Sequence, residues 1–432
     1  MKISTNSIIA FFLLVYFIIR THGIAGYIPS IWVAPLFIFF VFSVIIILKL
    51  SRLILEQFIK DSKWIILSFI FLLICIYFEY GNFKLYDTFH YLGFSIPFYI
   101  IGFYWGLSGG DKNLKYTVVG YFIFISLYLF TKLIQVNNFA NITPETIGWF
   151  FYVAGGFTLN DLTFFWPFAA FVSILAYAFF AEQNQDLIKK ILILTLTSIC
   201  LISFLVSGVA APLVLIFTTI LIYYFIKNGL KGKIKLLVTL PFIILFYFLT
   251  IFLLGSDTIG TFGNITSKSG GVLLLIDSGK FFDEDIFNVI LSDRWTSAGY
   301  SFNQFLEKPF IGHGCYLDTL TYRSGITIFL GASGGHSFVL DSLAYYGIFG
   351  VLLIMILIKF SRNALQYFRI ADQKEKKTAL IFASLIISLF ISNILNSTFL
   401  GSSFDNFVFL CCGFFLGKYY IIKYSTFNLI KE

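Results

Sequence analysis

Charged residues are scarce in this 432-residue chain, making up 12% of the sequence, whereas hydrophobic residues make up 59%. The core of a water-soluble protein of this length does not need so much apolar surface. Apolar runs of about 20 residues recur along the whole chain, which is the pattern of a polytopic α-helical membrane protein. The runs are continuous and do not alternate with a period of two, which excludes a membrane β-barrel.

Cysteines are also few, and their positions exclude a disulfide framework. Four of the five lie within apolar runs, where a cysteine usually behaves as a small hydrophobic residue: Cys75, Cys200, Cys411 and Cys412. Cys315 lies in a more polar segment that holds no other cysteine. The sequence therefore indicates neither a disulfide nor a zinc site.

We predict an all-α fold with about twelve transmembrane helices, because a segment in hydrocarbon must pair its own backbone polar groups. The predicted spans are residues 6–20, 30–49, 64–80, 89–107, 116–135, 161–181, 189–206, 211–227, 236–254, 337–359, 379–395 and 404–422. Residues 1–255 then hold helices 1–9, residues 256–336 form one large outer loop with an amphipathic helix, and residues 337–432 hold helices 10–12 and a tail.

The net charge of +8 reflects orientation in the membrane. If the spans simply alternate in direction, 22 of the 30 basic residues fall on one side together with 8 of the 22 acids. An excess of Lys and Arg marks cytoplasmic loops, so both ends of the chain are predicted to lie in the cytoplasm. Because orientation in the membrane accounts for the positive charge, the charge does not indicate a nucleic-acid partner. We expect the lipid bilayer as a partner and no nucleic acid.

The outer loop contains an amphipathic pattern that begins near Arg294. Apolar residues recur there at three- and four-residue steps: Trp295, Ala298, Phe302, Phe305 and Leu306. This spacing predicts a helix that ends at Pro309 and rests its apolar face on the membrane surface or on the helix bundle. The guanidinium of Arg294 presents a planar fork of donors that suits a diphosphate, although an arginine paired with a nearby acid has the same sequence signature.

A glycine-rich turn and a second arginine follow that predicted helix. The segment Pro309-Phe310-Ile311-Gly312-His313-Gly314 permits a tight turn that brings backbone close to a ligand. Arg323 is the other arginine of the loop, and it is either a ligand clamp or a surface residue. Asp341 belongs to a set of charges near the outer span ends, which favours a polar cavity open to the outside.

His336 stands where the chain re-enters the membrane, and it opens a spaced pattern. His336-Ser337 is followed by nine residues and then by Gly347-Ile348-Phe349-Gly350. A histidine at the outer mouth of a helix can accept a proton near neutral pH, as a general base must, or it can merely cap the helix. Gly347 and Gly350 allow close approach of a neighbouring segment.

Together these segments resemble the O-antigen polymerase (Wzy) and O-antigen ligase (WaaL) superfamily. The pattern of that superfamily is a histidine followed by Asn, Ser or Gln, nine residues, a glycine, two residues, and Gly, Thr or Tyr. Residues 336–350 fit it without a gap. The stretch from Arg294-Trp295 to the turn at residues 309–314 is similar to the family as well, as is a large periplasmic loop before the last spans.

The resemblance implies a GT-C-like, metal-independent glycosyltransferase without a cofactor, in the bacterial inner membrane, with its active site facing the periplasm. Such an enzyme of lipopolysaccharide and surface polysaccharide biosynthesis uses undecaprenyl-diphosphate-linked glycans as donor and acceptor, and a chain-length regulator protein is a further implied partner. Arg294 and Arg323 would hold the diphosphate, and His336 would be the catalytic base. We assign His313 and Asp341 to substrate binding.

Polymerase is the favoured interpretation, because the arginine that many ligases carry near residues 207–209 is absent here. The alternatives are a ligase that transfers the glycan to lipid A-core and a flippase for the same lipid-linked glycans. A flippase often shows paired halves, which this chain lacks. A further alternative is another GT-C glycosyltransferase that uses an acid as its base, and Glu79 and Asp87 would then form its site. The run Asp283-Glu284-Asp285 matches the Asp-x-Asp metal pattern, but nucleotide sugars are cytoplasmic.

Overall fold

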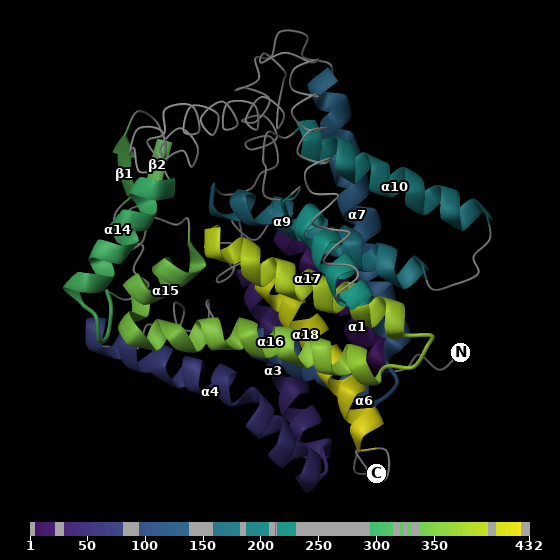
Figure 1. Ribbon diagram of the computed structural model, residues 1–432, viewed down its shortest axis with the longest axis horizontal. Helices are drawn as coiled ribbons and strands as arrows, with labels where there is room; N and C mark the ends of the chain where they lie inside the picture. The colour runs from purple at the N-terminus through teal and green to yellow at the C-terminus, as the bar shows by residue number, and fades with distance from the viewer. Residues whose placement is uncertain are drawn as a thin grey trace.

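The computed structural model describes residues 5–21, 30–80, 95–137, 159–181, 187–206, 212, 214–229, 294–313, 320–323, 326–329, 337–395 and 403–424. Nearly all of these residues are helical, as the composition predicts (Figure 1). A hairpin of β1 (Leu320–Arg323) and β2 (Ile326–Phe329) departs from the prediction, with Arg323 opposite Ile326 in an antiparallel pair. The all-α fold class is confirmed by the helices that make up nearly all of the described residues, and the two four-residue strands are a local exception.

The apolar runs before the outer loop form helices. They are α1 (Thr5–Thr21), α3 (Ser30–Lys49), α4 (Arg52–Tyr80), α6 (Ser95–Leu107), α7 (Asp111–Asn137), α9 (Leu159–Ala181), α10 (Leu187–Val206) and the helix Val214–Gly229. Each lies on a predicted span, and α4 extends beyond its span by a polar first part. The predicted span 236–254 lies outside the described residues.

The chain after the outer loop is helical as well. It forms α15 (Phe338–Tyr346), the single turn η2 (Gly347–Phe349), α16 (Gly350–Ile370), α17 (Lys376–Leu395) and α18 (Ser403–Lys423). Four described stretches are long and apolar enough to cross a bilayer: Asp111–Phe130, Phe338–Ile370, Lys376–Asn393 and Asn406–Lys423. With the shorter apolar helices they define a multi-pass helical membrane protein. The number twelve stays a prediction.

α6 and α18 form the closest helix pair of the bundle. A Cβ atom added at Gly102 would lie 2.0 Å from the carbonyl oxygen of Leu410, and one added at Gly413 would lie 2.1 Å from that of Tyr99. Gly106 and Gly417 repeat this contact one helical turn further along, so each helix contributes a Gly-x-x-x-Gly pair. In membranes, small residues at this spacing let two backbones touch, and dispersion contacts then hold the helices together.

α4 and α16 pack in opposite directions along one face of the bundle. The Lys359 ammonium lies 2.5 Å from the Asp61 carboxylate, and the rings of Phe349 and Phe71 stack with centroids 4.2 Å apart. Moving ten residues forward along α4 therefore corresponds to moving ten residues back along α16. This register identifies which ends of the two helices share a side of the membrane.

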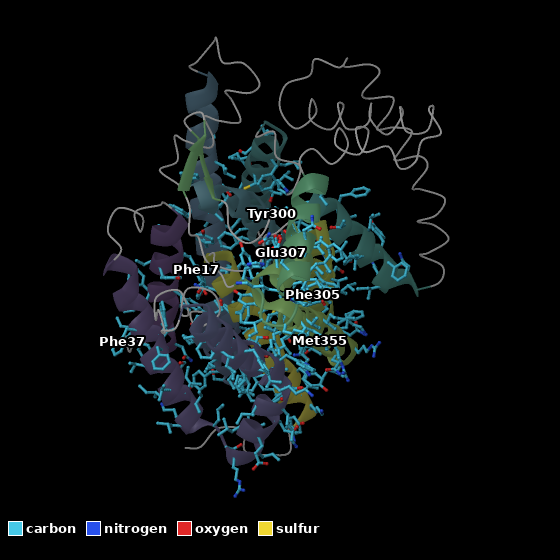
Figure 2. All side chains as sticks on the ribbon, turned by 90° about the vertical axis from the view of Figure 1, so that its left-hand side faces the viewer. Phe17, Phe37, Tyr300, Phe305, Glu307 and Met355 are labelled. Atoms are coloured by element: carbon cyan, nitrogen blue, oxygen red, sulfur yellow. The ribbon has the colours of Figure 1, made fainter. Side chains whose placement is uncertain are left out.

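Side-chain burial separates the interior of the bundle from a lipid-facing surface. Phe17 of α1 is fully buried in the bundle, whereas Phe37 of α3 lies at its outer edge and is 68% exposed (Figure 2). Large apolar side chains are exposed on α1, α3, α4, α7, α10 and α16 as well. A surface of this kind matches a bilayer and not water.

Several polar contacts between helices of the described residues lie at two opposite ends of the bundle. One end holds the hydrogen bonds from Ser95 to Asn406 and from Asn406 to Tyr16, at 3.0 and 2.8 Å. The other end holds the Asp61–Lys359 pair and the ion pairs of Lys418. In each contact, the two helix ends that meet would lie on the same side of the membrane if the predicted spans alternate in direction. The assignment of that second end to the cytoplasm rests on its basic residues and stays a prediction.

Candidate functional site

α14 (Arg294–Glu307) packs against α15, and a buried carboxylate joins the two helices. Asp341 is 3% exposed, and its Oδ1 accepts a hydrogen bond from Ser301 Oγ at 2.7 Å. Its Oδ2 accepts from the backbone N–H of Ser337 at 3.2 Å. A buried carboxylate is costly unless its oxygens are paired, and these two bonds contribute to that pairing. The outer-loop helix is thereby fixed to the start of a membrane helix.

Local sequence explains why α15 starts at this point. Ser337 has an extended backbone, and its hydroxyl accepts from the Leu340 N–H at 3.4 Å, as an N-cap does. Asp341 lies in the first turn, where a negative charge is favoured by the helix dipole. The cap and the acid therefore define the helix start immediately after His336, which lies outside the described residues.

The glycine-rich turn after α14 packs directly on the junction between α15 and η2. The Ile348 N–H donates to the Pro309 carbonyl at 2.8 Å, and the His313 N–H donates to the Ala344 carbonyl at 3.0 Å. Both hydrogen bonds join backbone atoms, so the two chain segments must approach each other closely. The turn and the spaced-glycine pattern, 35 or so residues apart in sequence, thus form one structural unit.

Two glycines make that approach sterically possible. Gly312 and Gly347 have φ of +76° and +58°, a region that other residues rarely adopt. A Cβ at Gly312 would lie 2.3 Å from the Tyr345 carbonyl oxygen, and one at Gly347 would lie 2.5 Å from the backbone carbon of Phe310. Each glycine therefore serves the contact between the two segments.

His313 is half-buried in the turn that follows α14. Its ring Nε2 lies 3.1 Å from the Gln304 carbonyl oxygen and 3.6 Å from a carboxylate oxygen of Glu307. A carbonyl oxygen only accepts, so Nε2 carries a hydrogen in this arrangement. His313 and Asp341, both predicted to bind substrate, belong to the same α14–α15 unit. Their contacts here are within the protein and do not test substrate binding.

The predicted apolar stripe of α14 is partly exposed, since Ala298 and Phe305 are half-buried whereas two other members are open to the surroundings. Phe302 and Leu306 are 46% and 58% exposed, and Phe310 in the following turn is 74% exposed. Ser301, on the side of α14 that faces α15, is fully buried. The stripe continues into exposed Ile348 at the start of the lipid-facing surface of α16. Figure 2 shows Tyr300, Phe305 and Glu307 along α14.

The structure locates the two arginines by backbone only. Arg294 is the first residue of α14, and Arg323 is the last residue of β1. Their side chains, like all of His336, lie outside the described part of the chain, so the predicted convergence of these three groups stays a prediction. No group of three potential metal ligands occurs among the described residues.

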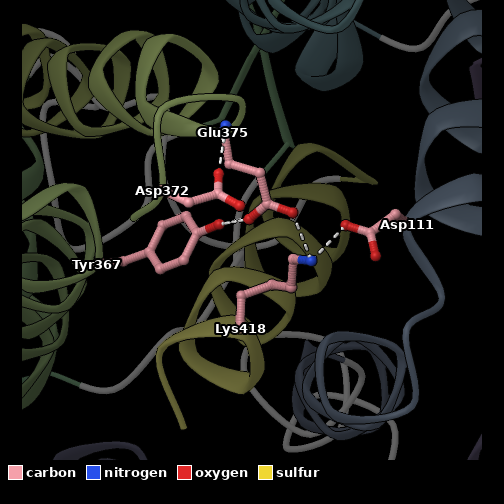
Figure 3. A network of polar contacts seen from close by, with 5 residues as sticks. All are labelled: Asp111, Tyr367, Asp372, Glu375 and Lys418. Atoms are coloured by element: carbon pink, nitrogen blue, oxygen red, sulfur yellow. Dashed lines mark hydrogen bonds and ion pairs between the residues drawn. The ribbon is translucent and has the colours of Figure 1, made fainter. Parts of the chain in front are cut away.

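Sequence reasoning missed a second polar cluster, at the opposite end of the bundle (Figure 3). Lys418 of α18 lies 2.8 Å from Asp111 and 2.7 Å from Glu375, and its side chain is 13% exposed. The Tyr367 hydroxyl donates a second hydrogen bond to Glu375. A lysine within an apolar helix signals such a cluster, because an unpaired ammonium is costly there.

The site must be interpreted from its own residues, since no family model matches the chain and no curated protein matches it.

Proposed function

We propose that this chain is a metal-independent membrane glycosyltransferase that joins undecaprenyl-diphosphate-linked oligosaccharide repeat units, as O-antigen polymerases do. The site would face the periplasm of a bacterial inner membrane. The observation that carries the proposal is the close packing of the two motif segments. Ser301 and Pro309 of the first segment contact Asp341 and Ile348 of the second, at 2.7 and 2.8 Å.

That packing supports the proposal because catalysis needs groups held in fixed relative positions. The first segment begins at Arg294, and the second is anchored at Ser337, the residue after His336. Asp341 would act as a positioning residue that holds α14 against the start of α15. A histidine next to such an anchor is suited to meet a substrate bound by the loop.

In the proposed reaction an acceptor sugar hydroxyl attacks the anomeric carbon of the donor. The new glycosidic C–O bond forms as the bond from the anomeric carbon to the phosphate oxygen breaks, and the electron pair leaves with undecaprenyl diphosphate. His336 takes the hydroxyl proton, and Arg294 and Arg323 stabilise the charge of the leaving diphosphate, an electrostatic role that gains strength in a site shielded from water.

The exposed stripe of α14 suits the lipid part of such a substrate. Phe302, Leu306 and Phe310 continue the apolar surface of the bundle to the helix that carries Arg294. A polyprenyl chain lying along this stripe within the outer leaflet would bring its diphosphate to the polar end of the loop. The same geometry serves a ligase, because the two enzymes differ in acceptor and not in donor.

The test is the surface glycan of a deletion strain complemented with His336→Ala. Loss of a general base typically costs about 10²–10⁴ in rate, so we expect chain growth to stop while the amount of protein in the membrane is unchanged. Asn303→Ala, an exposed position on α14, is the matched control and should restore full-length polymer. Full-length polymer from His336→Ala would refute the role of this histidine.

The deletion strain itself separates the alternatives. Single-repeat glycans on the surface indicate a lost polymerase, whereas polymer stranded on the lipid carrier indicates a lost ligase. Repeat units that accumulate on the cytoplasmic face of the membrane indicate a lost flippase. Only the first outcome supports the proposal as stated.

A further inference from the structure

A cavity of about 210 Å³ opens beside the Lys418 network, at the end of the bundle opposite α14. Three lysines line it: Lys112 and Lys115 from the start of α7, and Lys418 from α18. Lys112 and Lys115 are three residues apart, so they project from one face of the helix. The cavity is therefore built where the ends of α7, α16, α17 and α18 meet.

The acids in the cavity wall are already paired within the protein. Asp111 and Glu375 both bind Lys418, and Glu375 accepts a further hydrogen bond from Tyr367. Lys418 has three N–H donors, of which the two carboxylates use two, so one donor remains for another acceptor. With Lys112 and Lys115 at the rim, the cavity favours an anion over a cation.

Three phenylalanines form an apolar part of the cavity wall. Phe414 and Phe415 of α18 are almost fully buried, and Phe179 of α9 completes this side. The ring of Phe415 stacks on Phe382 of α17 with centroids 3.9 Å apart. A free phosphate ion has no apolar atoms to pack against these rings. A phospholipid has both a charged headgroup for the lysines and apolar atoms for the phenylalanines.

We propose that this cavity binds the phosphate headgroup of an anionic phospholipid, with Lys112, Lys115 and Lys418 as donors and the phenylalanine wall against the glycerol and upper acyl region. The cytoplasmic leaflet is rich in anionic lipids, and basic pockets between transmembrane helices on that side bind their headgroups. The positive end of the α7 helix dipole adds to the attraction. The inference does not depend on the proposed transferase activity.

The experiment measures lipid binding by native mass spectrometry of the full chain in detergent. Short-chain phosphatidylglycerol, short-chain phosphatidylcholine and inorganic phosphate are titrated separately. We expect specific binding of phosphatidylglycerol, and a roughly 10- to 30-fold weaker affinity in the double variant Lys112→Ala, Lys115→Ala, from the loss of two lysine charges that attract the anionic headgroup. The single variant Lys112→Gln, at an exposed position, should bind about 3- to 10-fold more weakly.

The matched control is the double variant Lys60→Ala, Lys63→Ala. These lysines are exposed, three residues apart on α4, and do not line the cavity. An equal loss of affinity in both double variants would show diffuse surface attraction and overturn the proposal. Equal binding of phosphatidylcholine would overturn the anionic headgroup. Equally tight binding of inorganic phosphate would leave a phosphate site and overturn its assignment to a lipid.

Discussion

At the scale of single residues, the candidate site at the α14–α15 unit depends on residues that allow two backbone segments to approach closely. Gly312 and Gly347 adopt a left-handed φ and let two backbone segments touch. Asp341 then closes the same unit from the other side by accepting from Ser301 and Ser337. Substitution of either glycine or of Asp341 would therefore first weaken the packing between the two segments, and any effect on chemistry would follow from that.

Gly347→Ala tests this dependence. The added methyl meets backbone atoms of Pro309 and Phe310 at 2.5–2.6 Å, and the left-handed φ costs about 1–3 kcal/mol more in alanine. We expect a lower thermal unfolding midpoint for the protein purified in detergent. Gly299→Ala on α14 is the control, because nothing lies within 4 Å of its Cβ and alanine is the better helix former by about 1 kcal/mol. An unchanged midpoint for Gly347→Ala would show that the turn does not pack on η2.

At the scale of elements, the pairing of α6 with α18 is the clearest determinant of the bundle. The two helices run in the same direction, because contacts of Gly102 with Leu410 are followed by contacts of Gly106 with Gly417. Helices 4 and 12 of the predicted topology share this direction. The pair also brings Ser95 of α6 to Asn406 of α18.

Gly413→Ala tests that pairing. Its Cβ would lie 2.1 Å from a backbone oxygen of α6, which cannot move away as a side chain can, so the helices must separate at a cost of about 1–3 kcal/mol or more. We expect less folded protein in fluorescence-detected size-exclusion chromatography after heating. Gly120→Ala is the matched variant within a span, because its Cβ would meet the flexible end of Leu14, and it should behave like the wild type. Similar losses in both variants would argue against the α6–α18 contact.

At the scale of the whole molecule, the polar contacts divide the bundle into two ends with different chemistry. The α14 end carries a half-buried histidine and a buried aspartate, and the opposite end carries lysines paired with acids. α15, the turn η2 and α16 link the two ends. At about 1.5 Å per residue, the 21 residues of α16 are by themselves about as long as the hydrocarbon core of a bilayer is thick.

Cysteine labelling tests which end faces the cytoplasm. In a Cys315→Ser background, Asn303→Cys on α14 should react with a membrane-impermeant maleimide in cells with a permeabilised outer membrane. Gln373→Cys, in the exposed turn before α17, should react only after the inner membrane is lysed. The physical reason is the excess of basic residues at the Gln373 end. The reverse labelling pattern would invert the topology and remove the proposed site from the periplasm.

Features that depend on neighbouring residues were predictable. Apolar runs become helices because each run pairs its own backbone groups, so α3 begins and ends where the span was predicted. The span predicted to begin at residue 337 begins at Phe338 as α15, and the helix α14 followed from its spacing. The hairpin could have been found too, since Ser324-Gly325 between two runs rich in β-branched and aromatic residues is a turn signal. It was missed because helices dominate the chain.

Features that join distant residues were decided by the tertiary structure. Ser95 meets Asn406 across 311 positions, Lys359 meets Asp61 across 298, and Thr378 meets Ala178 across 200. No local pattern marks such partners, because in hydrocarbon any polar group gains from any other. The sequence by itself determined that this is a helical membrane protein. It also identified residues whose side chains can accept a proton or bind an anion. Tertiary packing decided that Asp341 joins two motifs, and that Lys418 completes a basic cavity at the opposite end.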